Sequence, residues 1–269
     1  MNRSISSAPG WLWPLPCPAD APVALICFPS AGGGAVGYRS LIEPLRACAD
    51  VYIASLPGRE FRLREEPARH LEDLVSPLAS AVAELANRRL VVFGHSFGAL
   101  LAYEVLHRLY DDGCIAADAA HLVVSGRIAP HLASRTPRLS HLPARDIVFR
   151  IAELHRNIPA TLLEEPDYVA MIGRALQADL RINEHYRWRE RRPLPCPITA
   201  VGGISDPVAS RAEMNAWGRH SRIGFKSRFV EGDHFYFRAP AGQQLLIELL
   251  QQSCSSFTAE RGAATAIAQ

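Results

Sequence analysis

The sequence of 269 residues is poor in several features that mark particular classes of protein. It holds one lysine beside 28 arginines, and its formal charge is only +2, so it lacks the basic excess of a typical nucleic-acid-binding protein. No apolar run reaches 18 residues, which predicts that no segment spans a membrane. Hydrophobic residues make up 48% of the chain, which excludes a disordered protein and supports one large core.

The cysteines argue against both a disulfide framework and a zinc site. No C-x-x-C pair occurs, and no histidine follows a cysteine at zinc-ligand spacing. The six residues lie far apart, at Cys17, Cys27, Cys48, Cys114, Cys196 and Cys254. We expect reduced thiols and, since the first 25 residues show no apolar stretch behind a basic start, a cytoplasmic protein.

Short apolar runs alternate with helical patterns along the chain, which predicts a mostly parallel sheet with helices on both faces. The expected strands are 22–28, 50–54, 89–93, 121–125, 197–201 and 225–230. The expected helices are 38–47, 69–86, 98–110, 207–217 and 241–252. The fold class is therefore α/β.

The alternation of strands and helices breaks once. Some 65 residues between the fourth and fifth strands show helical spacing only, and such a length is too great for a connecting loop. We predict an inserted helical lid over 127–192, within a core formed by 21–126 and 193–252. Residues 1–20 are expected to form an N-terminal extension and 253–269 a flexible tail.

The strongest chemical signal is the pentapeptide Gly94-His95-Ser96-Phe97-Gly98. G-x-S-x-G alone should appear by chance in roughly one chain in ten of this length. Here, however, it follows the apolar run LVVF and opens the helical segment GALLAYEVLHRLY. Strand, sharp turn and helix are the context of a nucleophile elbow, in which side chains larger than glycine would collide with the backbone. Ser96 is therefore the candidate nucleophile.

Candidate partners for the serine follow the last two strands. Asp206 lies in GGISDP after the fifth expected strand, and His234 lies in EGDHF after the sixth. Open α/β sheets carry their sites at these strand ends. The order Ser96, Asp206, His234 is that of α/β-hydrolases, in which an imidazole takes the serine proton and a carboxylate orients the imidazole.

Each assignment has a structural alternative. His95 adjoins the serine, but neighbouring side chains in a sharp turn diverge, so we interpret it as a packing or hydrogen-bonding residue. Asp233 is excluded as the carboxylate partner of His234 by the same argument. Asp206 precedes a proline and could simply form a turn. The other eight histidines are interpreted as surface or packing residues.

A glycine-rich loop, residues 28–35, follows the first expected strand. It lacks the lysine and the Ser/Thr of a P-loop. Small residues there would let a backbone N–H approach a tetrahedral oxygen, together with the N–H of the residue after the nucleophile. We predict an oxyanion hole formed by Ala31 and Phe97, with Gly32 as the alternative loop donor.

With these motifs in place, residues 11–252 resemble a type II thioesterase of polyketide and nonribosomal peptide biosynthesis, within the α/β-hydrolase superfamily. The resemblance rests on several motifs in order: WLWPLP, LICFPSAGGGA, LPGRE, FGHSFGALLAYEV, SGRIAP, LQADLRINEHYRW, GGISDP and GDHFYF. Two positions depart from it, since Ser30 stands where relatives often have histidine and LHRNIPATLL lacks an expected Gly-Gly pair.

The resemblance implies hydrolysis of acyl or aminoacyl thioesters on the phosphopantetheine arm of an acyl or peptidyl carrier protein. Ser96, His234 and Asp206 would act through an acyl-enzyme, without metal or cofactor, to clear stalled or aberrant groups. We expect no nucleic-acid or membrane partner and a monomer. A small-molecule esterase or peptidase of the same fold, an acyltransferase, and a carrier-binding scaffold with a vestigial site remain as alternatives.

The arginines are distributed unevenly. Residues 127–192 hold 12 arginines against 8 acidic residues, whereas the rest of the chain is net negative. Four of these arginines lie in HYRWRERR, where the expected lid rejoins the sheet. Because carrier proteins in these pathways tend to be acidic near the arm, we predict docking at Arg189, Arg191 and Arg192. Genome composition could produce the same arginine bias.

Overall fold

The computed structural model describes residues 10–15, 21–155 and 158–267. Seven strands form one sheet in the order β1-β3-β2-β4-β5-β6-β7, parallel except for the pair β1 and β3. The strands are β1 Leu12–Pro14, β2 Val23–Phe28, β3 Asp50–Ala54, β4 Arg89–His95, β5 Ala120–Ser125, β6 Ile198–Gly203 and β7 Phe225–Val230. All six expected strands are therefore confirmed: 50–54 and 225–230 have the expected ends, and the ends of the other four are shifted by one or two residues.

Helices cover both faces of this sheet. The longer ones are α2 Glu72–Ala83, α3 Phe97–Asp111, α4 Ala144–His155, α6 Pro166–His185 and α8 Pro240–Ile267. The short ones are α1 Arg39–Ile42, α5 Ala160–Leu163 and α7 Arg211–Asn215, with single 3-10 turns at Val36–Tyr38, Glu43–Ala47, Glu60–Arg62, Ala216–His220 and Tyr236–Arg238. None of the described helices is long and apolar enough to cross a membrane.

Successive residues of a strand point to opposite faces of the sheet, and each face has its own hydrophobic core. Ala24, Ile26 and Phe28 of β2 pack with α2, α3 and α7 on one face, and Val23 and Leu25 pack with α1 and α8 on the other. Every residue of β2 is buried, as a central parallel strand requires. The predicted α/β architecture is confirmed.

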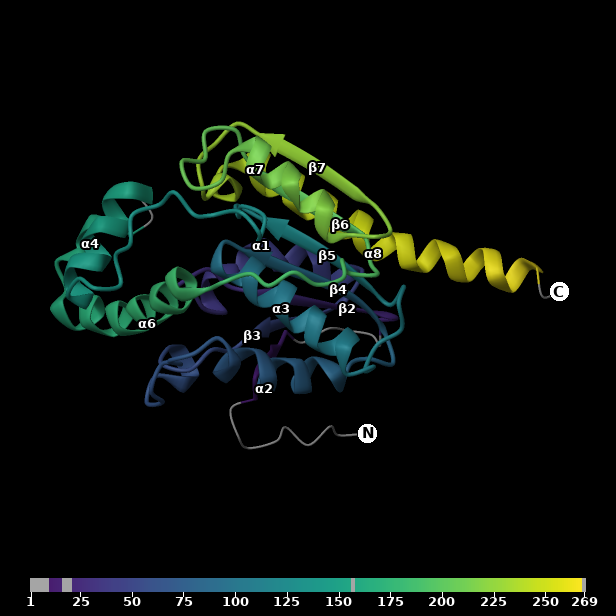
Figure 1. The fold of residues 1–269 in the computed structure, drawn as a ribbon, viewed down its shortest axis with the longest axis horizontal. Helices are drawn as coiled ribbons and strands as arrows, with labels where there is room; N and C mark the ends of the chain where they lie inside the picture. The colour runs from purple at the N-terminus through teal and green to yellow at the C-terminus, as the bar shows by residue number, and fades with distance from the viewer. Residues whose placement is uncertain (1–9, 16–20, 156–157, 268–269) are drawn as a thin grey trace.

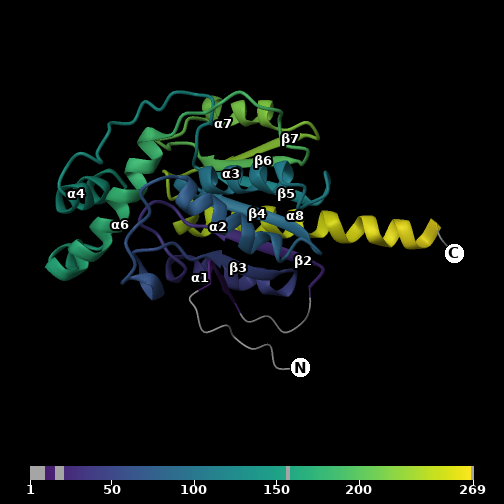
Figure 2. The ribbon, with the colours of Figure 1, turned by 60° about the horizontal axis from the view of Figure 1, so that its bottom comes forward.

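The predicted lid segment contains α4, α5 and α6. These helices share a small apolar cluster around Ile147, Val148, Val169 and Leu176. Figures 1 and 2 show α4 and α6 on the side of the sheet opposite the free end of α8. In Figure 1 the arrows of β5 and β7 point toward α4 and α6, so this cluster lies at the carboxyl ends of the strands.

Two expectations at the chain ends need correction. The predicted N-terminal extension contains strand β1, where Trp13 pairs with Ile53 at the sheet edge; residues 1–9 and 16–20 lie outside the described residues. A strand of three residues, one of them a proline, is too short to show strand periodicity, so only its pairing with β3 identifies it. The helix expected to end near 252 continues to Ile267, through the predicted tail, and within it Cys254 and Phe257 still pack on the core.

Candidate active site

Ser96 occupies the turn between β4 and α3. Its backbone has φ 54° and ψ −114°, a conformation that is strained for any residue with a Cβ. The turn is as tight as the motif predicts. A Cβ on Gly98 would lie 2.0 Å from the carbonyl oxygen of Phe28, and one on Gly94 would lie 2.3 Å from that of Gly98. Both glycines are therefore required to raise Ser96 above the sheet.

Asp206 and His234 meet at the carboxyl ends of β6 and β7. His234 Nδ1–H donates to Asp206 Oδ2 at 2.9 Å, and both side chains are buried. Asp206 Oδ1 accepts the N–H groups of Val208 and Ala209, so the aspartate forms a turn as well as holding the histidine. The bond at Nδ1 leaves Nε2 of His234 as the nitrogen available for catalysis.

A cavity of about 760 Å³ brings the candidate residues together. Ala31, Ser96 and His234 line it, together with apolar side chains of α4 and α6. In the described part of the chain no hydrogen bond joins Ser96 to His234. Catalytic hydrogen bonds are often long before substrate binds, so this geometry is compatible with a resting hydrolase.

The two candidate loop donors differ in what they bind. The N–H of Gly32 donates to Asp179 Oδ2 at 2.8 Å, so this group is already engaged. Ala31 lines the cavity beside Ser96, and its N–H has no acceptor among the described residues. Phe97 is the first residue of α3, where a backbone N–H lacks a partner within the helix. These contacts favour the pair Ala31 and Phe97 over Gly32.

The neighbouring residues in the sequence do not compete for these roles. His95 is fully buried and its Nδ1 bonds the Ser125 hydroxyl at 2.9 Å, which in turn contacts the Tyr236 hydroxyl at 3.0 Å. Burial, followed by the proximity of His234, lowers the pKa of His95 well below its ordinary value. Asp233 is exposed and caps the N–H of Phe235. His95 is thus a packing and hydrogen-bonding residue, as predicted.

The sequence did not single out His155, which the lid brings to the site. The imidazole of this last residue of α4 stacks on His234, with ring centroids 4.8 Å apart and planes at 30°. Burial, and then the nearby His234, lowers the pKa of His155 to about 4, so it is neutral at pH 7. It is a packing residue, as expected for the dispersed histidines, but it packs on the candidate catalytic base.

The side chain of Glu60 fills the hollow of the glycine-rich loop. Gly32, Gly34 and Gly37 match the letters G-x-G-x-x-G after a strand, a pattern typical of dinucleotide sites. Here, however, the N–H groups of Ala35 and Val36 donate to the Glu60 carboxylate at 2.7 and 2.8 Å. An anion bound to these N–H groups excludes the pyrophosphate that such a site would hold.

The three predicted docking arginines separate into two kinds. Arg189 and Arg192 are exposed. Arg191 instead pairs with Glu104 at 2.5 Å, and its guanidinium lies 4.7 Å from the ring centroid of Tyr103. The charge of Arg191 is thus already paired within the chain. Docking at Arg189, Arg191 and Arg192 stays a prediction.

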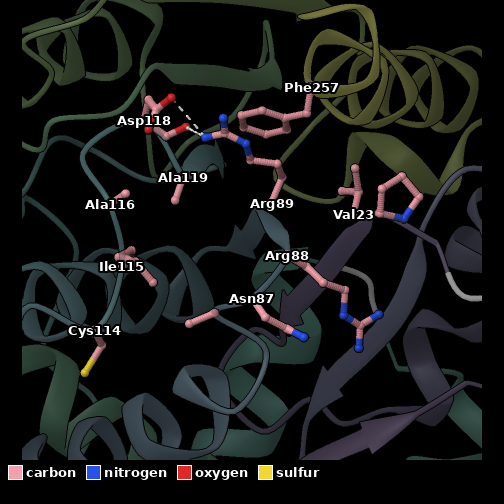
Figure 3. Close-up of a pocket in the computed structure, with 12 residues that line it drawn as sticks. Val23, Asn87, Arg88, Arg89, Cys114, Ile115, Ala116, Asp118, Ala119 and Phe257 are labelled. Carbon is pink, nitrogen blue, oxygen red and sulfur yellow. Dashed lines mark hydrogen bonds and ion pairs between the residues drawn. The ribbon is translucent and has the colours of Figure 1, made fainter. Parts of the chain in front are cut away.

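A second pocket lies at the amino ends of the parallel strands, where β2 and β4 begin (Figure 3). It measures about 270 Å³ and contains none of the predicted site residues. Figure 3 shows Arg89 between Asp118, 3.1 Å away, and the ring of Phe257. This pocket is not part of the candidate active site.

Fold and site together define an α/β-hydrolase. A family model described as "Thioesterase domain" matches residues 23–254. The chain belongs to this thioesterase family, whose members are hydrolases acting on thioester bonds. The predicted class of enzyme is thereby confirmed.

Three similar proteins illustrate the relationship. The RedJ thioesterase from the prodiginine pathway of Streptomyces coelicolor is 35% identical, with a TM-score of 0.78 over 87% of this chain and 86% of that one. The type II thioesterase BorB of the borrelidin cluster is 30% identical, with a TM-score of 0.78 over 89% and 97%. "Linear gramicidin dehydrogenase LgrE" of Brevibacillus parabrevis is 32% identical over 96% and 97%. The resemblance to type II thioesterases is confirmed.

Proposed function

We propose that the protein hydrolyses acyl or aminoacyl thioesters from the phosphopantetheine arm of a carrier protein in a polyketide or nonribosomal peptide assembly line. Removal of stalled or aberrant groups would be its task. The observation that carries the proposal is the His234–Asp206 hydrogen bond at 2.9 Å beside a strained Ser96 in a lid-covered cavity. The names of the similar thioesterases support the assembly-line setting.

The proposed reaction passes through an acyl-enzyme. Ser96 Oγ attacks the thioester carbonyl carbon while His234 Nε2 takes its proton, and Asp206 stabilises the resulting imidazolium. The N–H groups of Ala31 and Phe97 bind the oxyanion. The C–S bond then breaks, and His234 returns the proton to the departing thiol. Water, activated by His234, adds to the acyl-serine and releases the carboxylic acid. The residues require no cofactor.

The walls of the cavity suit an acyl chain. Its lid side carries apolar residues, namely Leu139, Leu142, Ile151, Leu154, Leu176 and Leu180. An apolar pocket distinguishes chains that differ by one methylene by only about 1–3 kcal/mol. Such weak discrimination fits an enzyme that clears many different groups, and we expect broad acyl selectivity.

Intact-mass measurement of loaded carrier proteins tests this function. Carriers bearing acetyl, longer acyl and aminoacyl groups should lose them with the wild-type protein. Ser96→Ala should lower the rate by about 10⁶-fold, as removal of the nucleophile does in serine hydrolases. Thioester hydrolysis by Ser96→Ala at the wild-type rate would contradict the mechanism. Faster turnover of a matched small ester than of the carrier would instead favour an esterase.

Three other functions are weighed against this one. An acyltransferase would release the acyl group to an acceptor other than water, which the same mass measurement detects. A vestigial scaffold would fail to react with a fluorophosphonate at Ser96. A dehydrogenase, the activity in the name of LgrE, is not proposed because Glu60 fills the hollow where a dinucleotide phosphate would bind. A cytoplasmic, monomeric protein stays our expectation.

A further inference from the structure

Arg59 and Asp179 form a buried ion pair between the core and the lid. The guanidinium of Arg59, in the loop after β3, donates to Asp179 Oδ2 at 2.6 Å and to Oδ1 at 2.9 Å. Arg59 is 7% exposed and Asp179, on α6, is 1% exposed. The two residues are 120 positions apart in the sequence. Two-point pairing of this kind fixes both distance and orientation.

The same carboxylate holds the glycine-rich loop. Asp179 Oδ2 accepts the N–H of Gly32 at 2.8 Å, and Arg59 Nη1–H donates to the carbonyl oxygen of Gly33 at 3.2 Å. One turn earlier on α6, Leu176 contacts this loop, since a Cβ on Gly32 would lie 3.1 Å from Leu176 Cβ. Gly32 has φ +68°, a backbone conformation that is strained for a residue with a side chain.

These contacts immobilise the residue that follows Ala31. We infer that Asp179 and Arg59 are positioning residues that aim the N–H of Ala31 at the oxyanion, so that helix α6 of the lid completes the oxyanion hole. This inference rests on the proposed thioesterase mechanism and adds two residues to it. If α6 moved away, Gly32 would lose its acceptor and Arg59 its partner, so this part of the loop would lose two of its contacts.

The inference predicts a particular kinetic signature. An oxyanion exists only in the tetrahedral transition state and intermediate, so a misplaced donor lowers kcat and leaves KM nearly unchanged. Removing one oxyanion donor typically lowers kcat by about 10²–10³-fold. Displacing such a donor, as Asp179→Asn would by losing the charge paired with Arg59, should lower kcat by about 10²-fold.

The test compares Asp179→Asn with Asp50→Asn. Asp50 also pairs with an arginine, Arg88, but at the opposite edge of the sheet. We would measure kcat and KM with a small acyl thioester, and the affinity of an alkyl trifluoromethyl ketone, whose adduct with Ser96 carries an oxyanion. All rates would be divided by the concentration of active enzyme, measured by titrating Ser96 with a fluorophosphonate.

We expect Asp179→Asn to lower kcat and ketone affinity in parallel by about 10²-fold, with KM within about threefold. Asp50→Asn should stay within about twofold of wild type in all three. Arg59→Lys keeps the charge but loses the two-point pairing with Asp179, so it should lower kcat and ketone affinity by a smaller factor. This variant replaces Asp179→Asn in the test if Asp179→Asn does not fold.

Two results would overturn the inference alone. In one, Asp179→Asn and Arg59→Lys keep wild-type kcat and ketone affinity per titrated site. In the other, they lower activity only as far as Asp50→Asn does, which indicates a purely structural ion pair. Failure of the wild-type protein to hydrolyse any thioester, or to bind the ketone, would instead contradict the proposed function.

Discussion

The parallel strands define two edges of the sheet, one at their amino ends and one at their carboxyl ends. Both edges contain paired aspartates, but they differ in the burial and the partners of these residues. At the amino-terminal edge, Arg88 pairs with the buried Asp50, and Arg89 pairs with the exposed Asp118. At the carboxyl-terminal edge, Asp206, Asp179 and His234 are all buried. Asp206 binds His234, and Asp179 binds Arg59. The carboxyl edge also holds the strained Ser96. Strain and buried charge are costly, so their concentration at one edge marks the edge that function has shaped.

The largest difference between the edges should be seen on neutralising an aspartate. We expect Asp206→Asn to lower kcat by about 10⁴-fold, because an asparagine leaves His234 in the wrong tautomer. Asp50→Asn at the other edge should stay within about twofold. Steady-state kinetics with a small thioester measures both. A loss below tenfold for Asp206→Asn would mean that another group orients His234.

Acid stability should distinguish a buried lid histidine from an exposed one. The pKa of His155 falls from 6.5 to about 4 on folding, so the unfolded chain binds more protons between these values. Its contribution to stability is present above pH 6.5 and is lost as pH falls through this window. We expect His155→Phe to reduce the loss of unfolding free energy between pH 7 and pH 5 by about 2 kcal/mol.

The control for this experiment is His70→Phe, since His70 is exposed. Denaturant melts of both variants and of the wild-type protein are measured at pH 7 and pH 5. His121, near the start of β5, also has its pKa lowered to about 4 by burial. By the same linkage, its replacement should reduce the loss of unfolding free energy by a similar amount. An unchanged pH dependence in His155→Phe would contradict the neutral, buried state of this imidazole.

The smallest expected effect concerns carrier docking. Charge reversal in Arg189→Glu and Arg192→Glu should raise KM for a carrier-bound substrate by about threefold to tenfold each and spare a small thioester, because exposed charges act mainly on association. Arg222→Glu, exposed just before β7, is the matched control and should change neither KM. If all three charge reversals raised KM for the carrier-bound substrate equally, the effect would reflect the overall charge of the protein and would contradict docking at Arg189 and Arg192.

Much of the candidate site could be predicted because its signals are local. Gly94 and Gly98 around Ser96 reveal a tight turn within five residues, and Asp206 and His234 each follow a recognisable strand. Parallel strands place such ends side by side without further information. The helical lid could be predicted for the same reason, since the spacing of its apolar residues is a property of each helix alone.

Other features could not be read from local patterns. Strand β1 is too short to show periodicity and exists through pairing with β3. Nothing within the motif LPGRE shows that Glu60 fills the hollow of the glycine-rich loop. Nothing in the run HYRWRERR shows that Arg191 pairs with Glu104 of α3, 87 positions away. Each of these outcomes depends on which distant residue lies within a few ångströms.

The sequence by itself determined the fold class, the strained nucleophile turn and the three residues proposed for catalysis, because turn chemistry and hydrophobic periodicity act over a few residues. Only the tertiary structure decided that Asp179 of the lid binds Arg59 and Gly32, and that His155 stacks on His234. Hydrogen bonds and ring contacts require distances of a few ångströms, and for residues far apart in the chain only folding sets those distances.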